Sequence, residues 1–484
     1  MKRSFADILQ DLDGDRERKL ARKLPEWAAV GAEVPSALAL EQCSSCTTAY
    51  YKAYLAGQAA AAGELRASRY PSQPAGWAPP VHDATGGTVP PAALPAPAGS
   101  ENTDAFSKCP FGSVLDLTGG MGVDSWAFSK VAERVVYFER DAELAAAAER
   151  NFARLGAGNI EVRCETVTPD TELPEADLIY ADPARRDAAG RKVFLLEDCT
   201  PDILTLLPTL LRKAPAVLLK VSPMADLSML SERLGTALRE IHIVEYDGEV
   251  KELLCLLRHD TAPAEPEIVI ARLSGQAAAA AKLRFAHPSQ PLGWAPPVHD
   301  ATGGTVLPAA PPDPESYLCF RGSEERNAEV RYAAEVRPGD ILLEPCPALL
   351  KAGAFRLPCA RWGLLKLAPS THLYLLPGAD PGHFAPGDEK NGVPGADTPS
   401  SAPGTRFPDG VEAWFKVRSV QEVLPFGAAA FKDLRGRFPQ AEITARNLPL
   451  GSDALRKKMG IAPGGDAHIF ACRLADARAA LIVT

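Results

Sequence analysis

The chain has 484 residues, of which 46% are hydrophobic and 23% are charged, and this composition is typical of a folded protein with two or three domains. Its 52 basic and 61 acidic residues give a formal net charge of -9. That balance excludes proteins that coat nucleic acid or an anionic membrane by bulk charge, although it allows a local basic patch.

The first segment, residues 1–66, is predicted to form a small helical domain. Apolar positions recur there every three or four residues, with little β-branched content, as in amphipathic helices. Its opening stretch, MKRSFADILQDLDGDRERK, has charges where a secretory signal needs an apolar run, and nowhere do 18 apolar residues follow one another. We therefore expect a cytoplasmic protein that does not enter membranes.

The ten cysteines are spread along the whole chain, as is typical of free thiols in a reducing compartment. Only Cys43 and Cys46 form a CxxC pair, and no second Cys or His pair lies at the spacing of a zinc site. The pair therefore predicts the start of a helix, and we expect no metal.

Three stretches rich in Pro, Ala, Gly and Ser interrupt the chain, at residues 67–107, 275–315 and 377–408. The first two contain one repeat, which is identical in both copies except that Leu292 replaces Ala75. Each copy ends in DATGGTV, which imitates a phosphate loop, but no strand leads into it and Pro follows in place of a helix. Segments of this composition bury too little apolar surface to fold, so we expect flexible insertions without chemistry.

Residues 108–274 alternate strand and helix patterns, which predicts an α/β domain with a parallel sheet. Only DGEV separates the last two strands, so these should form an antiparallel pair. The expected strands are residues 113–117, 134–139, 159–163, 176–181, 216–221, 240–246 and 251–257. Residues 316–484 mix strand and helix signals and predict a separate α+β domain.

The segment VLDLTGGMGVDSWAFSK, residues 114–130, carries the clearest functional signal. A strand ends, small residues form a turn, and an apolar helix follows. Glycines let the backbone approach a ligand closely and the helix start offers free amide donors, so this loop is expected to bind a nucleotide-like cofactor. The residues expected to take part are Asp116, Thr118, Gly119, Gly120 and Gly122.

The residues alone leave two cofactor classes open. Gly120, Gly122 and Ser125 approximate the GxGxxG pattern of nicotinamide-binding proteins. Asp116, in contrast, suits a ligand with a cationic amino-acid portion and is unfavourable beside a pyrophosphate. Glu139, which ends the second strand, can hold the ribose hydroxyls of either class.

A second polar motif, Asp182-Pro183-Ala184-Arg185, ends the fourth strand. It lies at the carboxyl edge of the sheet, where open α/β folds bind their substrates. Four cations occur between residues 185 and 192. Such a run is either a solvated surface or a contact for a phosphate backbone.

Three motifs resemble those of class I S-adenosylmethionine-dependent methyltransferases: VLDLTGGMGVDS, VVYFERD and DLIYADPARRD. The chain is similar above all to a bacterial group in which a helical segment with LEQCSS and TAYYKA precedes a domain with DPARR and a C-terminal THUMP-like domain. The segments LLKAGAFRL and ITARNLPLGSDALRKKMGIAPGGDAHIF resemble the third part. Because the similarity covers nearly everything except the Pro-rich stretches, it supports their interpretation as insertions.

This resemblance implies a Rossmann-like methyltransferase sheet with S-adenosylmethionine as the cofactor. Asp116, together with Thr118, Gly120 and Gly122, would then hold the methionine portion. The resemblance further assigns Glu139 to the ribose and Glu165 to the neighbourhood of the adenine, although the CETVTPD segment is also compatible with an ordinary polar loop.

For the methyl acceptor, the resemblance implies Asp182, Pro183 and Arg185 as the residues that face it. Enzymes that methylate base amines commonly have Pro and an aromatic residue where this chain has Ala184 and Arg185, so a stacking surface is missing. RNA uracil-C5 methyltransferases share DPAR but need a cysteine after the fifth strand, where this chain has Ser222. Cysteine-mediated carbon methylation is therefore not expected.

RNA is the substrate class that the resemblance favours, because THUMP-type domains bind RNA. Residues 431–458 add a basic excess, and a helix carrying Arg456, Lys457 and Lys458 is either a phosphate contact or a solvated helix end. Three alternatives stay open: a methyltransferase for a non-RNA substrate, a cofactor-binding and RNA-binding protein without catalysis, and a dehydrogenase, which Asp116 argues against.

Overall fold

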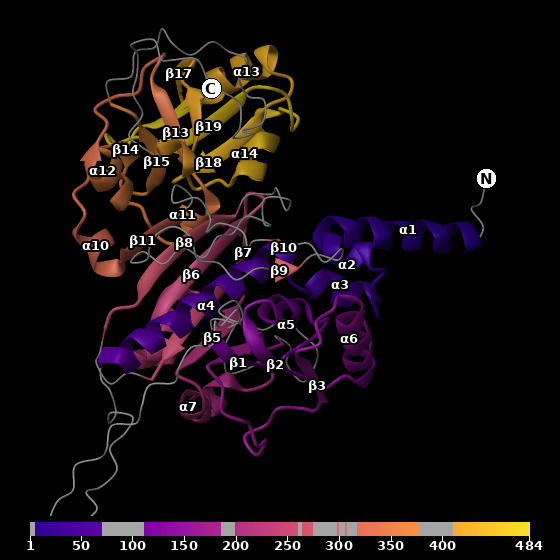
Figure 1. Cartoon of the computed structure of the whole chain (residues 1–484). Helices are drawn as coiled ribbons and strands as arrows, with labels where there is room; N and C mark the ends of the chain where they lie inside the picture. Colours follow the sequence, from indigo (N-terminus) through magenta and orange to yellow (C-terminus); the bar gives the residue numbers. More distant parts are fainter. Residues whose placement is uncertain are drawn as a thin grey trace, which may run out of the picture. The chain divides into compact units, whose positions relative to one another are not determined.

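The computed structural model describes residues 5–69, 111–184, 199–259, 264–273, 298–299, 305–306, 317–377 and 410–484 (Figure 1). The chain divides into two compact units, of which one comprises Met1–Glu240, Leu253–Ala264 and Leu273–Pro312 and the other Ile241–Glu252, Glu265–Arg272 and Asp313–Thr484. The first copy of the repeat lies outside the described residues. Within the second copy, β9 (Val298–His299) pairs antiparallel with β10 (Thr305–Val306).

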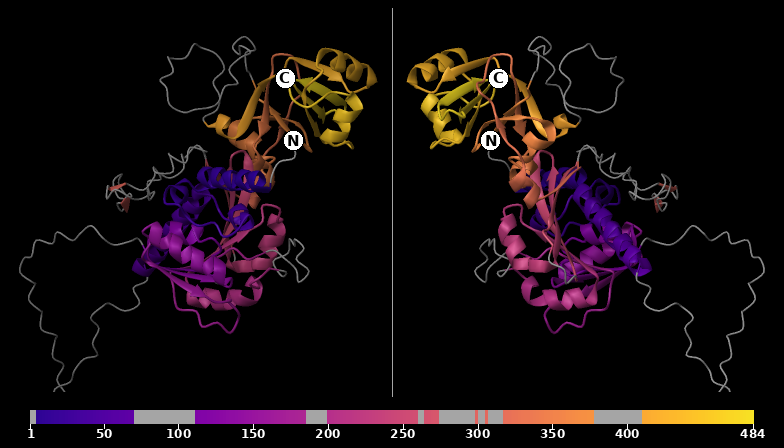
Figure 2. Two further views of the ribbon diagram at one scale, coloured as in Figure 1. Left: turned by 90° about the vertical axis from the view of Figure 1, so that its right-hand side faces the viewer. Right: turned by 90° about the vertical axis from the view of Figure 1, so that its left-hand side faces the viewer.

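Helices form the N-terminal segment, as the apolar spacing predicts. They are α1 (Phe5–Lys23), α2 (Pro25–Ala29), α3 (Ala37–Gln42) and α4 (Cys46–Arg69). The prediction that the CxxC pair marks a helix start is confirmed, because α4 begins at Cys46, while Cys43 directly follows the last residue of α3. Helix α4 packs against α5, β1 and β4, and Figure 2 shows these indigo helices against the magenta strands of the same unit.

The predicted fold class is confirmed, but the main sheet has nine strands where seven were expected. Their order is β11-β8-β6-β7-β5-β4-β1-β2-β3. The two extra strands, β8 and β11, pair antiparallel with each other although the second Pro-rich stretch separates them in the sequence. Local patterns do not reveal a pairing across such a gap. The strands are β1 (Phe111–Asp116), β2 (Ala132–Glu139), β3 (Ile160–Cys164), β4 (Leu178–Ala181), β5 (Ala216–Val221), β6 (Leu238–Tyr246), β7 (Glu249–Arg258), β8 (Glu267–Leu273) and β11 (Tyr317–Arg321).

Strands β5, β4, β1, β2 and β3 are parallel neighbours, so their carboxyl ends meet at one edge. Asp116, the last residue of β1, lies in register with Tyr137 of β2 and Tyr180 of β4. Strand β5 pairs antiparallel with β7. The last two predicted strands, β6 and β7, are neighbours in the sheet, and β8 and β11 extend it beyond β6. The helices of this region are α5 (Val123–Phe128), α6 (Ala142–Arg154), α7 (Ile203–Lys213) and α8 (Leu227–Leu234).

The second unit contains two further sheets with a shared core. The five-stranded sheet has the order β12-β14-β15-β13-β16 and the four-stranded sheet the order β17-β20-β19-β18. Leu342 and Leu373 of the first sheet pack against Phe470 and Ile482 of the other, and Figure 2 shows the orange and yellow strands beside one another. The strands are β12 (Arg331–Tyr332), β13 (Ile341–Pro345), β14 (Leu365–Ala368), β15 (Thr371–Leu375), β16 (Phe415–Ser419), β17 (Glu422–Pro425), β18 (Glu442–Arg446), β19 (His468–Arg473) and β20 (Ala479–Val483).

Two helices cover the opposite face of the four-stranded sheet. Leu434 of α13 (Ala428–Arg437) and Leu455 of α14 (Ser452–Met459) are fully buried against Ile443 and Ile469. The unit also contains α10 (Gly322–Asn327), α11 (Pro347–Lys351) and α12 (Leu357–Trp362). Among the described residues, no helix combines the length and the apolar character needed to cross a membrane.

Candidate functional site

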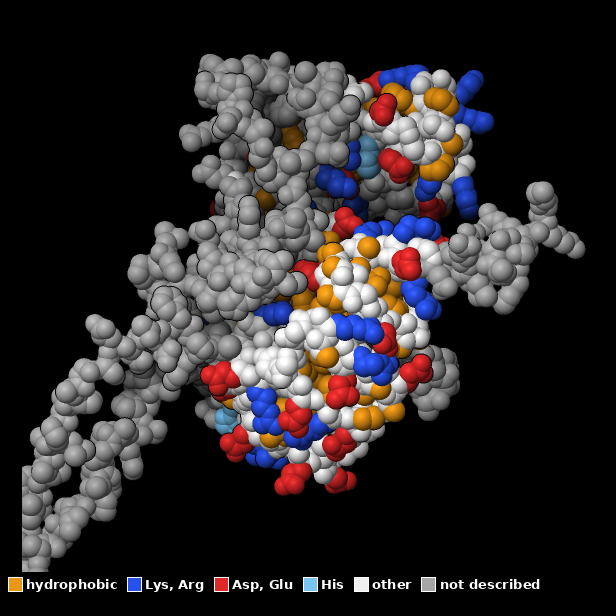
Figure 3. Space-filling model, turned by 45° about the vertical axis from the view of Figure 1, so that its right-hand side comes forward, with side chains coloured by type: hydrophobic (Ala, Val, Ile, Leu, Met, Phe, Trp, Pro, Cys, Tyr) orange, Lys and Arg blue, Asp and Glu red, His pale blue; other side chains and the backbone are white. Residues whose placement is uncertain are grey.

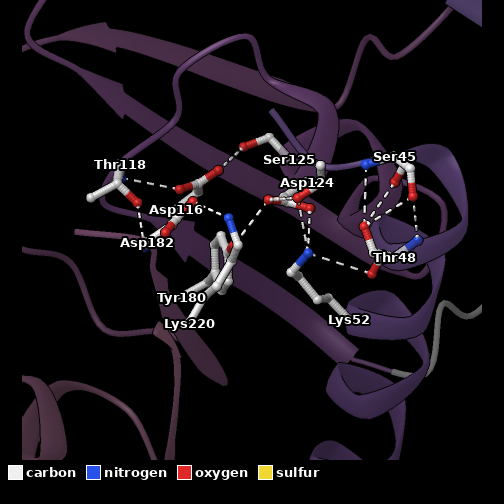
Figure 4. Close-up of polar contacts among 11 residues, drawn as sticks. Ser45, Thr48, Lys52, Asp116, Thr118, Asp124, Ser125, Tyr180, Asp182 and Lys220 are labelled. Carbon is white, nitrogen blue, oxygen red and sulfur yellow. Dashed lines mark hydrogen bonds and ion pairs between the residues drawn. The ribbon is translucent and has the colours of Figure 1, made fainter. Parts of the chain in front are cut away.

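The glycine loop between β1 and α5 is organised by Asp116 (Figure 4). The Asp116 side chain accepts hydrogen bonds from the Ser125 hydroxyl at 2.6 Å and from the Thr118 backbone N–H at 3.1 Å. Burial, with only 1% of the residue exposed, raises the pKa of Asp116 to about 7, although both hydrogen bonds oppose the rise. No cation is among the causes of this shift, so the carboxyl group is close to the balance between its neutral and charged forms at neutral pH.

Glu139, at the end of β2, holds the other side of the loop. Its carboxylate accepts hydrogen bonds from the backbone N–H of Gly120 and of Asp141, both at 2.8 Å. The Tyr137 hydroxyl donates to the Gly120 carbonyl at 2.6 Å. The loop is therefore fixed before any ligand binds, and Glu139 remains only half-buried and can accept further hydrogen bonds.

At two positions of this loop, no residue other than glycine fits. A Cβ atom on Gly119 would lie 2.0 Å from the Tyr137 ring, which is far inside van der Waals contact. Gly122 has a φ of 86°, and a Cβ there would lie 2.5 Å from the Phe152 ring. The loop is thus packed tightly onto β2 and α6, so the protein's own packing requires glycine at these two positions.

The motif after β4 adjoins the loop through Thr118. The Asp182 backbone N–H donates to the Thr118 hydroxyl at 2.6 Å, and the Asp182 carboxylate forms an ion pair with Lys220 of β5. Pro183 is buried and Ala184 is exposed. Arg185 and the cations that follow it lie outside the described residues, so their predicted role remains a prediction.

Glu165 is brought next to Glu139 by the backbone alone. Its N–H donates to the Glu139 carbonyl at 2.9 Å, while its side chain is exposed. The structure therefore brings together Asp116, Thr118, Gly119, Gly120, Gly122, Glu139 and Asp182, with Glu165 on the rim of this group.

A second buried polar network connects the N-terminal helices to the same segment, and the sequence did not reveal it. Lys52 of α4 is fully buried, and its ammonium lies 3.2 Å from the Asp124 carboxylate at the start of α5. The hydroxyls of Ser44 and Tyr180 each donate to Asp124 at 2.9 Å. Burial by itself would raise the pKa of Asp124, but Lys52, Lys220 and these hydroxyls outweigh it and hold the pKa below its usual value.

Lys220 and Lys52 are the two cations of these polar networks that motif analysis overlooked. Each is a single cation within an apolar run, AVLLKV for Lys220 and TAYYKAYLAG for Lys52. A cation that is buried within such a run needs a partner of opposite charge or a set of hydrogen-bond acceptors. The lone lysine in each run was therefore the sequence feature that could have revealed these residues. Which carboxylate it meets depends on strand and helix pairing, so the sequence could not name the partner.

The CxxC pair does not converge on a common ligand. The Cys43 thiol donates to the Leu40 carbonyl at 3.3 Å, and the Cys46 thiol donates to the Glu26 carboxylate at 2.9 Å. Within the described ranges no three His, Cys, Asp or Glu side chains are grouped as a metal would need.

A solved structure of similar architecture exists for a proposed methyltransferase from Porphyromonas gingivalis W83. The two chains are 27% identical, with a TM-score of 0.59, and the similarity covers 97% of this chain and 88% of the other. The fold is that of a class I methyltransferase. The match along almost the whole chain includes the N-terminal helices, so these belong to the shared architecture of this methyltransferase fold.

Two family models match parts of the second unit. Residues 342–378 match a ferredoxin-like domain and residues 415–484 match a THUMP domain-like family. The predicted C-terminal THUMP-like domain is therefore confirmed for the last 70 residues. No curated protein matches the chain.

Further similar structures correspond to only part of the chain. An rRNA methylase from Streptococcus thermophilus is 12% identical, with a TM-score of 0.24, over 31% of this chain and 86% of the other. A proposed methyltransferase from Streptococcus mutans, solved with S-adenosylhomocysteine, is 13% identical, with a TM-score of 0.24, over 30% and 88%. Similarity this limited carries no argument about the chemistry of this chain.

Proposed function

We propose that this protein is an S-adenosylmethionine-dependent methyltransferase that modifies RNA. The observation that carries the proposal is the glycine loop fixed between two carboxylates, Asp116 and Glu139, at the ends of adjacent strands. The enclosed Asp116, without a protein cation among the causes of its pKa shift, would attract the ammonium group of the methionine portion. Glu139, which is half-buried, would accept hydrogen bonds from the ribose hydroxyls. Glu165 would lie near the adenine.

The methyl acceptor would bind next to Asp182. The bound cofactor would supply an electrophilic methyl group, and the acceptor atom would bond to it as the carbon–sulfur bond breaks. The bond from Asp182 N–H to Thr118 fixes the strand end, and Lys220 holds the Asp182 carboxylate, so this carboxylate can orient the acceptor. Pro183 and Arg185 complete the acceptor motif in this proposal.

Two observations narrow the chemistry of the acceptor. Ser222, which is 3% exposed, follows β5 where a cysteine-dependent carbon methyltransferase would need its thiol. Enzymes that methylate base amines have Pro where this chain has the exposed Ala184, and an aromatic residue where it has Arg185, so a stacking side chain is missing from the motif. These features favour direct transfer to an oriented nucleophile over covalent catalysis.

RNA is proposed as the substrate class because residues 415–484 match a THUMP-like family. The main alternative to an enzyme is a protein that binds the cofactor and RNA without catalysis. All the features described would suit such a protein equally well, except the Asp182–Lys220 pair at the acceptor edge. A non-RNA substrate is the third possibility. Methyl incorporation into RNA separates the three.

The first test is isothermal titration with S-adenosylhomocysteine and, separately, with NAD. We expect micromolar binding of S-adenosylhomocysteine, no binding of NAD, and a loss of at least tenfold in affinity for Asp116→Ala. Asp177→Asn is the matched control, because Asp177 is an exposed carboxylate that accepts a hydrogen bond from Ser113 N–H at the opposite end of β1. Binding of NAD in place of S-adenosylhomocysteine would refute the proposed cofactor.

The second test is transfer of a labelled methyl group to RNA, followed by mass spectrometry of the nucleosides. Lys220→Met should reduce the transfer rate by about a hundredfold (about 2.7 kcal/mol) with a smaller effect on the affinity for S-adenosylhomocysteine, because Lys220 forms its ion pair with Asp182 of the acceptor motif. Cofactor binding without any methylated RNA would favour the binding protein or a different substrate.

A further inference from the structure

A basic cluster lies where the edge strands of the two C-terminal sheets approach each other. Strand β16 ends the five-stranded sheet and carries Lys416 and Arg418, and β18 ends the four-stranded sheet and carries Arg446. Glu344 of β13 joins them, because its carboxylate lies 3.3 Å from the Arg446 guanidinium and 3.9 Å from that of Arg418. We call Lys416, Arg418, Arg446 and His468 the basic rim.

His468 adds a neutral ring to the basic rim. Its ring stacks on Phe470 at 4.1 Å, with the two planes within 3°, and the Arg418 guanidinium lies 5.8 Å from the same Phe470 ring. The Thr444 hydroxyl lies 2.8 Å from His468 Nε2. Burial, followed by the fields of Arg418, Lys416 and Arg446, lowers the pKa of His468 to about 4, so the ring is neutral at physiological pH.

The balance of charge in this cluster is positive. Three cations meet one bridging acid, Glu344, while Glu442, in register with His468, accepts a hydrogen bond from Gly464 N–H at 3.0 Å. Lys416 is exposed, and 30% of the Arg446 side chain reaches solvent. Burial is the largest cause of the lowered pKa of His468, and all three cations add to it, so each lies close enough to act on the ring.

On the face drawn in Figure 3, Lys and Arg side chains alternate with Asp and Glu. With a net charge of -9, any binding of RNA must depend on a local group of cations. Within α14, Arg456 already pairs with Asp453, and Lys457 and Lys458 are exposed without a neighbouring aromatic ring among the described contacts.

We propose that the basic rim binds the phosphodiester backbone of single-stranded RNA, with Arg446 and Lys416 on phosphate groups and the His468 ring beside a base. Guanidinium groups pair with phosphate through two parallel hydrogen bonds, and a neutral ring adds stacking without sequence preference. The inference rests on the proposed function only in taking RNA as the partner. It assigns this role to residues that are distant in sequence, not to the cations of α14.

Glu344 provides the most discriminating variant. It competes with phosphate for both guanidinium groups, so Glu344→Gln should tighten RNA binding by about threefold, a direction that structural damage would not produce. Lys416→Gln should weaken binding about three- to tenfold and Arg446→Gln about tenfold, each with a salt-dependence slope shallower by about one. Lys457→Gln on α14 is the control of equal charge change and should have no effect beyond twofold.

The probe is a fluorescein-labelled oligouridylate of about twenty nucleotides, and its anisotropy is measured with the full chain between roughly 50 and 200 mM KCl, the interval over which phosphate contacts change affinity most. Poly-glutamate should compete at least tenfold less well than unlabelled oligouridylate. The proposal is overturned if Lys457→Gln weakens binding as much as Lys416→Gln does. It is also overturned if Glu344→Gln does not bind RNA more tightly, or if poly-glutamate competes as well as unlabelled oligouridylate. Because this binding needs no cofactor, its failure is distinct from failure of methyl transfer.

Discussion

Asp116 and Asp124 lie eight residues apart beside the glycine loop, and both are largely enclosed, but their partners differ. Asp116 ends β1 and has only hydroxyl and amide donors, and its pKa rises to about 7. Asp124 begins α5 and meets the buried Lys52 ammonium, and its pKa falls below the usual value. Burial acts on both, so the partner decides the direction of the shift.

The different partners indicate different roles: Asp124 belongs to a structural anchor, and Asp116 belongs to the proposed binding site. The pair of Lys52 and Asp124 is complete within the protein, and it fastens α4 to the start of α5. Asp116 is buried in a site where a negative charge is costly unless a cation arrives. A carboxylate that the protein leaves in this state is a candidate for ligand recognition, whereas a neutralised one is structural.

The largest expected effect comes from breaking the anchor. Lys52→Met keeps the length of the side chain but leaves the Asp124 charge buried without its cation, which typically costs about 3 to 5 kcal/mol in the free energy of unfolding. Thermal unfolding followed by tryptophan fluorescence measures it, because Trp27 and Trp126 lie edge to face at 6.1 Å between α2 and α5.

The double variant Lys52→Met with Asp124→Asn tests the origin of that loss. It removes both charges, so at least half of the lost stability should return. If the double variant is as unstable as the two single losses added together, the two residues act independently and the anchor interpretation is wrong.

The next effect concerns how stability depends on pH. The pKa of Asp116 is raised from 3.8 to about 7, so the folded state holds this proton more tightly than the unfolded state, and stability falls as pH rises from about 4 to about 7. The total loss is about 4 kcal/mol. Asp116→Asn cannot ionise, so its stability relative to the wild type should increase by that amount between pH 4 and pH 8, measured by urea unfolding.

Asp124→Asn should behave in the opposite way. Because the pKa of Asp124 is lowered, its contribution is present above its unfolded pKa and is lost as pH falls through the folded value. The variant should therefore be destabilised at pH 7 and approach the wild type in acid. Identical pH profiles for the two variants would remove the distinction between anchor and site.

The residues of the proposed binding site could be picked out from the sequence more fully than those of the anchor. Asp116, the glycines and Glu139 were accessible because a strand, a turn of small residues and a helix follow one another within one short segment. The ion pair between Lys52 and Asp124 joins residues 72 positions apart, so it depends on how α4 packs on the sheet. Patterns within a segment carry no information about such a contact.

The same limit applies to the second unit. The helix α14 was predicted from local spacing, and the structure has it at Ser452–Met459. Strands β17 and β20 were not predicted, although they pair antiparallel through residues about sixty positions apart, as Val423 with Ile482. The basic rim was likewise hidden, because Lys416 and Arg446 lie on edge strands of different sheets, and only the folded structure brings both close enough to act on His468.

The smallest expected effect sharpens the assignment of Asp116 as the ligand-recognition residue. With its pKa at about 7, binding of an ammonium-bearing ligand should favour the ionised form, so the affinity for S-adenosylhomocysteine should rise about tenfold from pH 6 to pH 8, with release of a proton. Ser125→Ala removes a hydrogen bond that stabilises the charged form, which should move the midpoint of this rise upward by about one pH unit (about 1.4 kcal/mol). Titration calorimetry in buffers of different ionisation enthalpy measures both the affinity and the proton release. Asp116→Asn should abolish the pH dependence, and a rise that persists in this variant would assign the titration to another group.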